Sequence, residues 1–111
     1  MLSVTGIGII PKGKKIKEFQ TGKVIFMSFV LATKDPYKNR KQWIKVSVMV
    51  PIDKIEKARE IIKEGNVIQI RHADLYGIIN DNDTVHMTVN TSWPFIEHLR
   101  RIPTPERKEE K

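Results

Sequence analysis

The chain has 111 residues, no cysteine, and a formal net charge of +7 from 20 basic and 13 acidic side chains. This length suits a single domain, and the absence of cysteine excludes disulfides, thiolate metal sites and cysteine nucleophiles. No segment approaches the ~20 apolar residues of a membrane span, and the opening MLSVTGIGII lacks the basic start of a signal peptide. We therefore expect a soluble, intracellular protein.

Three strands are predicted in the first half of the chain, at residues 3–10, 23–34 and 42–50, because these segments are rich in valine, isoleucine and phenylalanine and each stops at or near a proline. Alternation in the third strand predicts a core face of Ile44, Val46, Val48 and Val50. Its other face holds Trp43, Lys45, Ser47 and Met49. Both faces of the second strand are apolar, so the pattern leaves its core side open.

A helix is predicted at residues 52–65, IDKIEKAREIIKEG. Asp53 fits the N-cap, Glu56 three residues later completes a capping box, and Gly65 fits the C′ position. One face of the helix is apolar and is formed by Ile55, Ala58, Ile61 and Ile62. This face needs a partner to cover it.

The last two strands are predicted at residues 66–76 and 84–91. In the first of them the apolar positions change parity between Ile70 and Ala73, which predicts a bulge at Arg71-His72. An unbroken ladder through these residues would contradict the prediction.

The end of the chain is predicted to be less regular. The segment PFIEHL, residues 94–99, is expected to form a short helical turn. Residues 103–111 are polar and follow a proline, so we expect a flexible charged tail. Residues 1–102 then form the single domain.

The positive charge is concentrated in one third of the chain. Residues 10–45 contain ten basic and two acidic side chains, whereas the rest of the chain contains ten and eleven. Two aromatics, Tyr37 and Trp43, lie in this basic segment. A solvated face would explain the lysines alone, but aromatics among cations favour single-stranded nucleic acid, because rings stack on bases while cations bind phosphates.

Five strands with one helix between the third and fourth is the element order of the OB-fold, a Greek-key barrel that binds oligonucleotides across its second and third strands. Over about residues 3–91 the sequence resembles the bacterial-type single-stranded DNA-binding proteins (SSB). The similar features are FMSFVLAT, QWIKVSVMVP with its leading tryptophan, the helix ending KEGNVIQI, and Phe19 shortly before Thr21-Gly22. The resemblance implies an all-β fold with one helix, namely a five-stranded OB-fold barrel.

The resemblance also implies a function and an assembly. It implies a protein that coats single-stranded DNA in replication, recombination or repair, in the cytoplasm with the nucleoid, or in a host cytoplasm if encoded by a virus or plasmid. Family members form homodimers or homotetramers through the first strand, where Gly6 and Gly8 permit close backbone approach. The chain ends PERKEEK in place of the family's linker and acidic tip, so we do not expect partner recruitment through such a tip. It also departs from the family at His72 and Asp74.

By position in the family, Trp43 is the expected stacking platform, with Tyr37 and Tyr76 near other stacking aromatics. Phe19 and Phe26 are further candidates, and packing is the alternative role for every one of these rings. Phosphate contacts are expected from Lys14, Lys15, Lys17, Lys23, Lys34, Lys38, Arg40, Lys41 and Lys45. No side chain stands out as a reader of base edges, so we expect weak sequence preference.

No catalysis, metal or cofactor is expected. The three histidines lack cysteine partners and metal-ligand spacing, and His72 and His86 are predicted to be cross-strand neighbours. Gly6-Ile7-Gly8 is not a phosphate-binding loop, because Pro11 follows and no helix begins there. Two alternatives stay open: an OB-fold RNA-binding or primosome-type accessory protein, and a basic module that binds an acidic protein.

Overall fold

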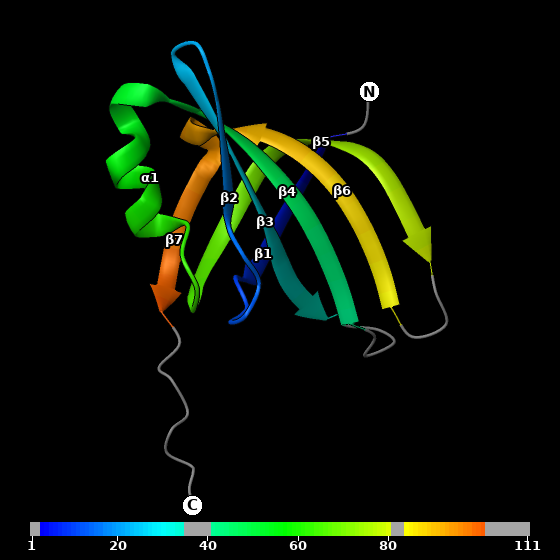
Figure 1. Cartoon of the computed structure of the whole chain (residues 1–111). Coiled ribbons are helices and arrows are strands. Elements are labelled where there is room, and N and C mark those ends of the chain that lie inside the picture. Colours follow the sequence, from blue (N-terminus) through cyan, green and yellow to red (C-terminus); the bar gives the residue numbers. More distant parts are fainter. Residues whose placement is uncertain (1–2, 35–40, 81–83, 102–111) are drawn as a thin grey trace, which may run out of the picture.

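The computed structural model of the protein describes residues 3–34, 41–80 and 84–101. This part of the chain is mostly β, with one short α-helix (Figure 1). The strands are β1 (Ser3–Ile9), β2 (Lys17–Thr21), β3 (Val24–Lys34), β4 (Lys41–Pro51), β5 (Asn66–Asn80), β6 (Thr84–Ser92) and β7 (Ile96–Arg101). The helical elements are η1 (Ile52–Lys54), α1 (Ile55–Ile61) and η2 (Trp93–Phe95).

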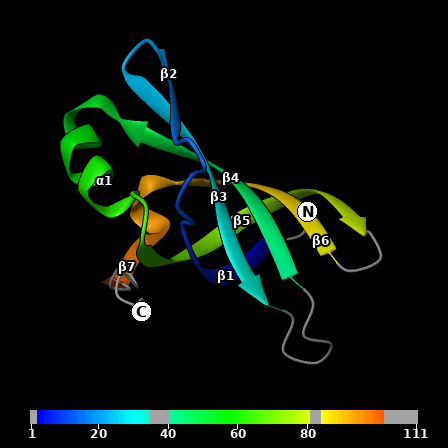
Figure 2. The ribbon, with the colours of Figure 1, turned by 60° about the horizontal axis from the view of Figure 1, so that its bottom comes forward.

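Five of the strands form a closed ring. Around the ring the order is β1, β3, β4, β6 and β5, and β5 pairs with β1 to close it. Every pairing in the ring is antiparallel except β4 with β6, which is parallel. The polypeptide reaches this parallel neighbour by way of α1 and β5, and Figure 2 shows α1 lying beside the ring.

Two strands were not predicted from the sequence. β2 pairs with β3 in a hairpin that turns at Gly22, where φ is +61°. β7 occupies most of the segment expected to form a helical turn; only η2 is helical, and β7 then pairs with residues 66–70 of β5. Both strands are short and exposed, with Ile96 the only buried residue in either, so neither has the apolar periodicity on which strand prediction depends.

The inner face of the ring is the core. In β4 the predicted core face is confirmed, because Ile44, Val46, Val48 and Val50 are at most 6% exposed. The side of β3 that the pattern left open is settled in favour of Ile25, Met27, Phe29 and Leu31. Burial on one face of both strands fixes their register, since a slip of one residue would turn the apolar set toward solvent.

Helix α1 packs on the core through Ile55 and Ala58, and the adjoining Ile62 is also buried. The predicted N-cap is wrong: Asp53 lies inside η1, and Lys54 occupies the N-cap of α1 without a side-chain hydrogen bond. Pro51 has an extended backbone and starts the 3-10 turn first, so the α-helix begins later than the sequence indicated.

The other end of the helix is held by Asn66, which is 3% exposed. Its side-chain amide donates hydrogen bonds to the carbonyl oxygens of Glu60 and Ile61 at 3.3 and 2.9 Å. Arg101 donates in turn to Asn66 Oδ1 at 3.1 Å. The predicted C′ position of Gly65 is wrong, because the C-cap is Ile62 and Gly65 lies three residues beyond it. Gly65 has φ of +88°, and its N–H donates to the Ile10 carbonyl at 2.9 Å. Asn66 therefore caps the C-terminal end of the helix by binding two of its last carbonyl groups.

The bulge predicted at Arg71-His72 is confirmed. Val4 pairs with Ala73 and Gly6 with Ile70, so β5 has one more residue than β1 between these two pairs. His72 adopts φ of +52° there. The extra residue allows Ile70 and Ala73 both to be fully buried.

Close backbone approach at Gly8 occurs within the chain. A Cβ atom at this position would lie 2.9 Å from the Ala32 carbonyl oxygen and 3.2 Å from Leu31 Cβ. Only glycine therefore fits between β1 and β3. Gly6 is less constrained, since its nearest neighbours are Ile44 and Ile70 at 3.7 and 3.8 Å.

The predicted tail, residues 103–111, lies outside the described residues. Among the residues that the structure describes, no helix has the length and apolar character needed to cross a bilayer.

Candidate functional site

The outer face of β2, β3, β4 and β6 displays side chains in rows across the strands, because paired residues point to the same side. One row joins Phe19 on β2, Phe26 on β3 and Met49 on β4. A second row, nearer the other end of β4, joins Ala32, Trp43 and His86. The predicted outer face of β4 is thus confirmed, and it is continuous with the hairpin.

Trp43 lies half-buried on this face. The ammonium nitrogen of Lys14 is 5.5 Å from the centre of its ring. This distance is within the range of a cation–π contact. The structure therefore brings together the expected stacking platform and one of the expected phosphate-binding lysines.

Three more of the expected phosphate ligands lie around the outer face of β3, with β2 on one side and β4 on the other. Lys15, Lys17 and Lys45 line a shallow cleft of about 160 Å³ together with Ser28 and Val30. Lys17 faces Ser28 in the β2–β3 ladder, and Lys45 faces Val30 in the β3–β4 ladder. The floor between the three lysines is mainly apolar, with Ser28 as its polar member. The three positive charges around it favour an anion.

A second basic recess, of about 400 Å³, lies beside the first. It is lined by Lys14, Lys15, Lys63 and Arg101, with Glu64 as its acidic member. Arg101 is held in place by a hydrogen bond to the Glu64 carbonyl at 3.0 Å. Lys63 and Arg101 were not predicted as site residues, because they lie outside the basic segment of the sequence.

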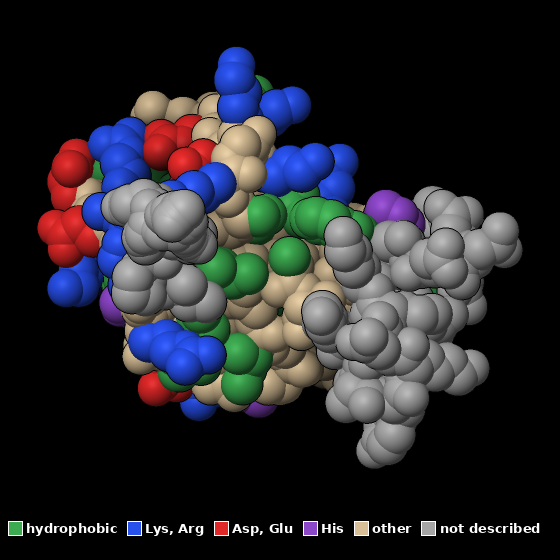
Figure 3. Space-filling model, turned by 90° about the horizontal axis from the view of Figure 1, so that it is seen from below, with side chains coloured by type: hydrophobic (Ala, Val, Ile, Leu, Met, Phe, Trp, Pro, Cys, Tyr) green, Lys and Arg blue, Asp and Glu red, His purple; other side chains and the backbone are tan. Residues whose placement is uncertain are grey.

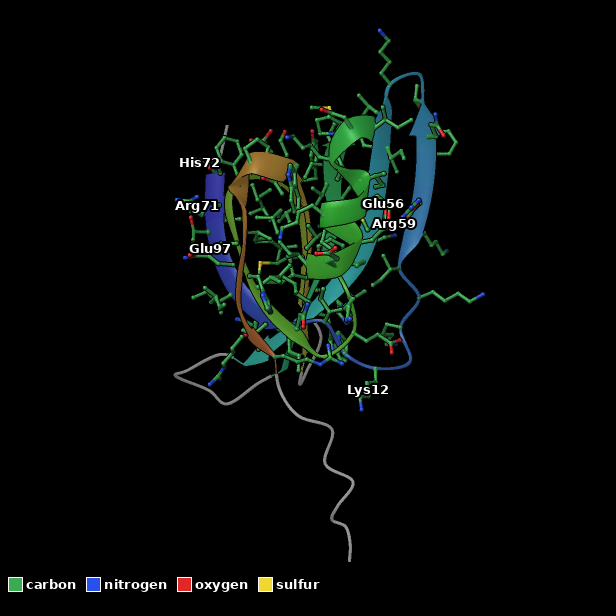
Figure 4. All side chains as sticks on the ribbon, turned by 90° about the vertical axis from the view of Figure 1, so that its left-hand side faces the viewer. Lys12, Glu56, Arg59, Arg71, His72 and Glu97 are labelled. Carbon is green, nitrogen blue, oxygen red and sulfur yellow. The ribbon has the colours of Figure 1, made fainter. Side chains whose placement is uncertain are left out.

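The hairpin is fixed to α1 by one ion pair. Arg59 donates from Nε and Nη2 to the two carboxylate oxygens of Glu18 at 2.9 and 2.8 Å, and from Nη1 to Glu56 at 3.1 Å. Figure 4 shows Arg59 pointing from α1 toward β2. The hydrogen bonds from Arg59 lower the pKa of Glu18 below its ordinary value. Glu18 points toward the helix, so its neighbours Lys17 and Phe19 face the outer surface.

Other expected residues lie elsewhere. Lys23 lies beside the hairpin turn and lines neither basic recess. Tyr76 is 66% exposed and is the extra residue of a second bulge in β5, between Leu75 and Gly77. Tyr37, Lys38 and Arg40, and the side chains of Lys34 and Lys41, lie outside the described residues.

The histidine prediction is wrong. His86 pairs with Ile79 on β5 and lies beside Trp43 on β4. His72 packs against Phe95, with ring centres 4.7 Å apart at 65°. The register of the β5–β6 ladder separates the two histidines, because Asp74 already pairs with Asn90, four residues beyond His86. No group of three or more histidine or acidic side chains in the described residues is arranged to hold a metal ion.

An apolar cavity of about 280 Å³ lies between β1 and the inner face of β4 and β6, bordered by Ile44, Ile70 and Met87 among others. Figure 3 shows hydrophobic side chains gathered in the middle of the face seen from below, with lysine and arginine side chains along its upper edge. Among the described residues, the lining of the cavity holds no charged side chain and is mainly apolar, unlike the basic surface.

Comparison with known proteins gives no match: no protein-family model, curated protein or solved structure is significantly similar to this chain.

Proposed function

We propose that this chain is an SSB-like protein with an OB-fold, which coats single-stranded DNA with little sequence preference in replication, recombination or repair. The ring order β1, β3, β4, β6, β5 supports the fold. In the OB arrangement, a five-stranded Greek-key barrel has a helix between its third and fourth strands along the chain, which here are β4 and β5. Under this proposal, copies of the chain assemble through β1, where Ile7 is 50% exposed.

The observation that supports single-strand binding most directly is the position of Trp43 beside the cleft of Lys15, Lys17 and Lys45. A single strand presents unstacked bases and a line of phosphates. An indole ring on the outer face stacks on a base, while the lysine cleft binds neighbouring phosphates. Duplex DNA hides the base faces, so the same surface binds it only through phosphates.

Lys14 takes part in both contacts. In the ligand-free protein its ammonium lies over the Trp43 ring. A base that stacks on this ring takes the place of the ammonium, which then binds the adjacent phosphate. The exchange keeps both the ring and the cation paired in the free and bound states.

The test is a titration with oligo-deoxythymidine at two salt concentrations, followed by tryptophan fluorescence. Stacking on Trp43 quenches its emission, whereas Trp93 is packed against the core and supplies a constant background. We expect strong quenching, and affinity that falls with a slope of about −0.7 in log–log form for each phosphate contact. Trp43→Ala should lose the quenching and weaken binding by about 1–3 kcal/mol.

Two controls decide between this function and the alternatives. Duplex DNA should compete weakly, and oligo-uridine measures the preference for DNA over RNA. Binding without quenching, or equal competition by duplex, would show that the basic surface is a charge patch without a stacking site.

A further inference from the structure

A recess of about 370 Å³ lies on the outer face at the opposite end of β4 from Trp43. Its apolar members are Phe26 on β3, Met49 on β4 and Phe95 on η2, and its polar members include His72 and Asp74 on β5 and Asn90 on β6. Phe26 and Met49 belong to the row that begins at Phe19. The recess is therefore continuous with the surface proposed to bind a single strand.

The bulge in β5 builds one wall of this recess. His72 is the single described non-glycine residue with positive φ, at +52°, a conformation that is strained for a side chain with a Cβ and persists where its surroundings fix it. Thr91 donates a hydrogen bond to the Arg71 carbonyl at 2.9 Å, and the His72 ring meets Phe95 edge-on. Figure 4 shows His72 and Arg71 on the same side of the molecule, near η2. These contacts hold the wall in one shape.

Two polar side chains of the recess, Asp74 and Asn90, are available for hydrogen bonds to a ligand. Asp74 and Asn90 are direct partners in the β5–β6 ladder, so their side chains lie on the same face. The carboxylate only accepts hydrogen bonds, whereas the amide both donates and accepts. Within the described part of the chain, neither side chain takes part in a hydrogen bond or an ion pair. An apolar slot with such groups along one side is the form of site that binds a flat, polar ring.

The carboxylate of Asp74 determines which part of a nucleic acid the recess can bind. A phosphate would be repelled by Asp74, whereas a base can donate to it. Single strands leave the Watson–Crick edge free. On that edge guanine has two adjacent N–H donors beside a carbonyl, while thymine has one N–H between two carbonyls. A carboxylate with two oxygens matches the two donors of guanine, and the Asn90 amide matches its carbonyl.

We propose that this recess binds one unstacked base of the bound strand and prefers guanine. The proposal rests on the single-strand binding proposed above and adds to it a preference at one position. Met49 is six residues from Trp43 along β4, which is about 20 Å in an extended strand. The preferred base therefore lies several nucleotides from the one stacked on Trp43, and always on the same side of it.

The experiment compares oligo-deoxythymidine of about 12 nucleotides with a set in which a single deoxyguanosine occupies each position in turn. Tryptophan quenching reports binding of every oligomer. We expect deoxyguanosine at one end region to raise affinity about tenfold, as one good bidentate contact does, and single deoxycytidine or deoxyadenosine to have smaller effects. Deoxyguanosine at the other end should have none.

The matched variants are Asp74→Asn and Glu60→Gln, which change the net charge equally. Asp74→Asn is close in shape to the native residue and should fold normally, as circular dichroism checks. It should abolish the guanine preference, so that oligomers with and without the deoxyguanosine bind with equal affinity. Glu60 lies on α1, paired with Lys57 at 3.8 Å, and Glu60→Gln should keep the preference.

The two proposals fail in different ways. Normal binding and quenching by oligo-deoxythymidine with no guanine effect at any position would overturn the base recess and leave single-strand binding intact. A guanine preference that survives Asp74→Asn would also overturn it. Absence of any quenching by oligo-deoxythymidine would instead remove single-strand binding, on which the recess depends.

Discussion

The two faces of the β3–β4 ladder use the same backbone for different purposes. On the inner face, Leu31 pairs with Ile44, and both are nearly inaccessible to solvent. One residue away, Ala32 pairs with Trp43 on a half-exposed surface that continues into lysines. The inner residues determine whether the chain folds, and the outer residues determine what it binds. Strand alternation keeps the two sets separate, so each can be changed without the other.

A substitution on the inner face should cause the largest loss of stability. Leu31 is 0% exposed, and Leu31→Ala should lower the free energy of unfolding by about 2–5 kcal/mol, since it removes buried methyl groups and leaves a cavity. Urea denaturation measures this. The neighbouring Val30→Ala, on the outer face, should cost much less. Equal losses in the two variants would contradict the separation of the faces.

Phe19 should show the reverse behaviour. It is 69% exposed, so Phe19→Ala should change the free energy of unfolding by no more than about 0.5 kcal/mol. If the row of Phe19, Phe26 and Met49 contacts bases, binding of oligo-deoxythymidine should weaken by about 1–3 kcal/mol. Leu99→Ala, which removes another exposed apolar side chain on β7, is the control and should leave affinity unchanged.

The lysines of the cleft should contribute to the salt dependence of the affinity for a single strand. Lys45→Gln should reduce the slope of log affinity against log salt by about 0.7, the contribution of one phosphate contact to a single strand. Lys57→Gln removes the same charge from the exposed side of α1 and should leave the slope unchanged. An identical change in both variants would mean that only net charge matters.

The smallest effect is expected at the ion pair that fixes the hairpin to α1. Because Arg59 lowers the pKa of Glu18 in the folded protein, the unfolded chain takes up the proton at higher pH. The stabilisation is therefore complete above the unfolded pKa of about 4.3 and is lost as pH falls through the folded pKa. Arg59→Gln should be slightly less stable than the native protein at pH 7, and the difference should shrink at pH 3. Because both groups are on the surface, salt should weaken it too.

The parts of the fold that sequence predicts well are those with a strong apolar period. The inner face of β4 and the bulge at Arg71-His72 both follow from where the apolar residues fall. β2 and β7 escape prediction because they bury almost nothing. The N-cap at Asp53 fails for another reason: Pro51 begins a 3-10 turn that shifts the start of the helix.

The candidate site divides in the same way. Trp43 and the cleft lysines are predictable because their residue types and strand phase are visible in the sequence. Lys63 and Arg101 join the basic surface only through the folding of β5 and β7 around Asn66. The recess at His72 depends on a bulge that turns a side chain away from its alternating position. It also depends on the contact of His72 with Phe95, which lies in η2, more than twenty residues further along the chain. Contacts between segments so far apart in the sequence can be identified only once the fold is known.

The contact between Lys14 and Trp43 also bears on the free protein. A half-exposed indole ring presents an apolar surface to which other proteins can bind non-specifically. An ammonium group over the ring shields it from such partners while remaining easy to displace. Under the proposed function, Lys14 thus competes with bases for the ring of Trp43. A single base in solution would have to displace Lys14 without offering it a phosphate, whereas a strand provides both. The proposed function therefore predicts that polymers are selected over free nucleosides.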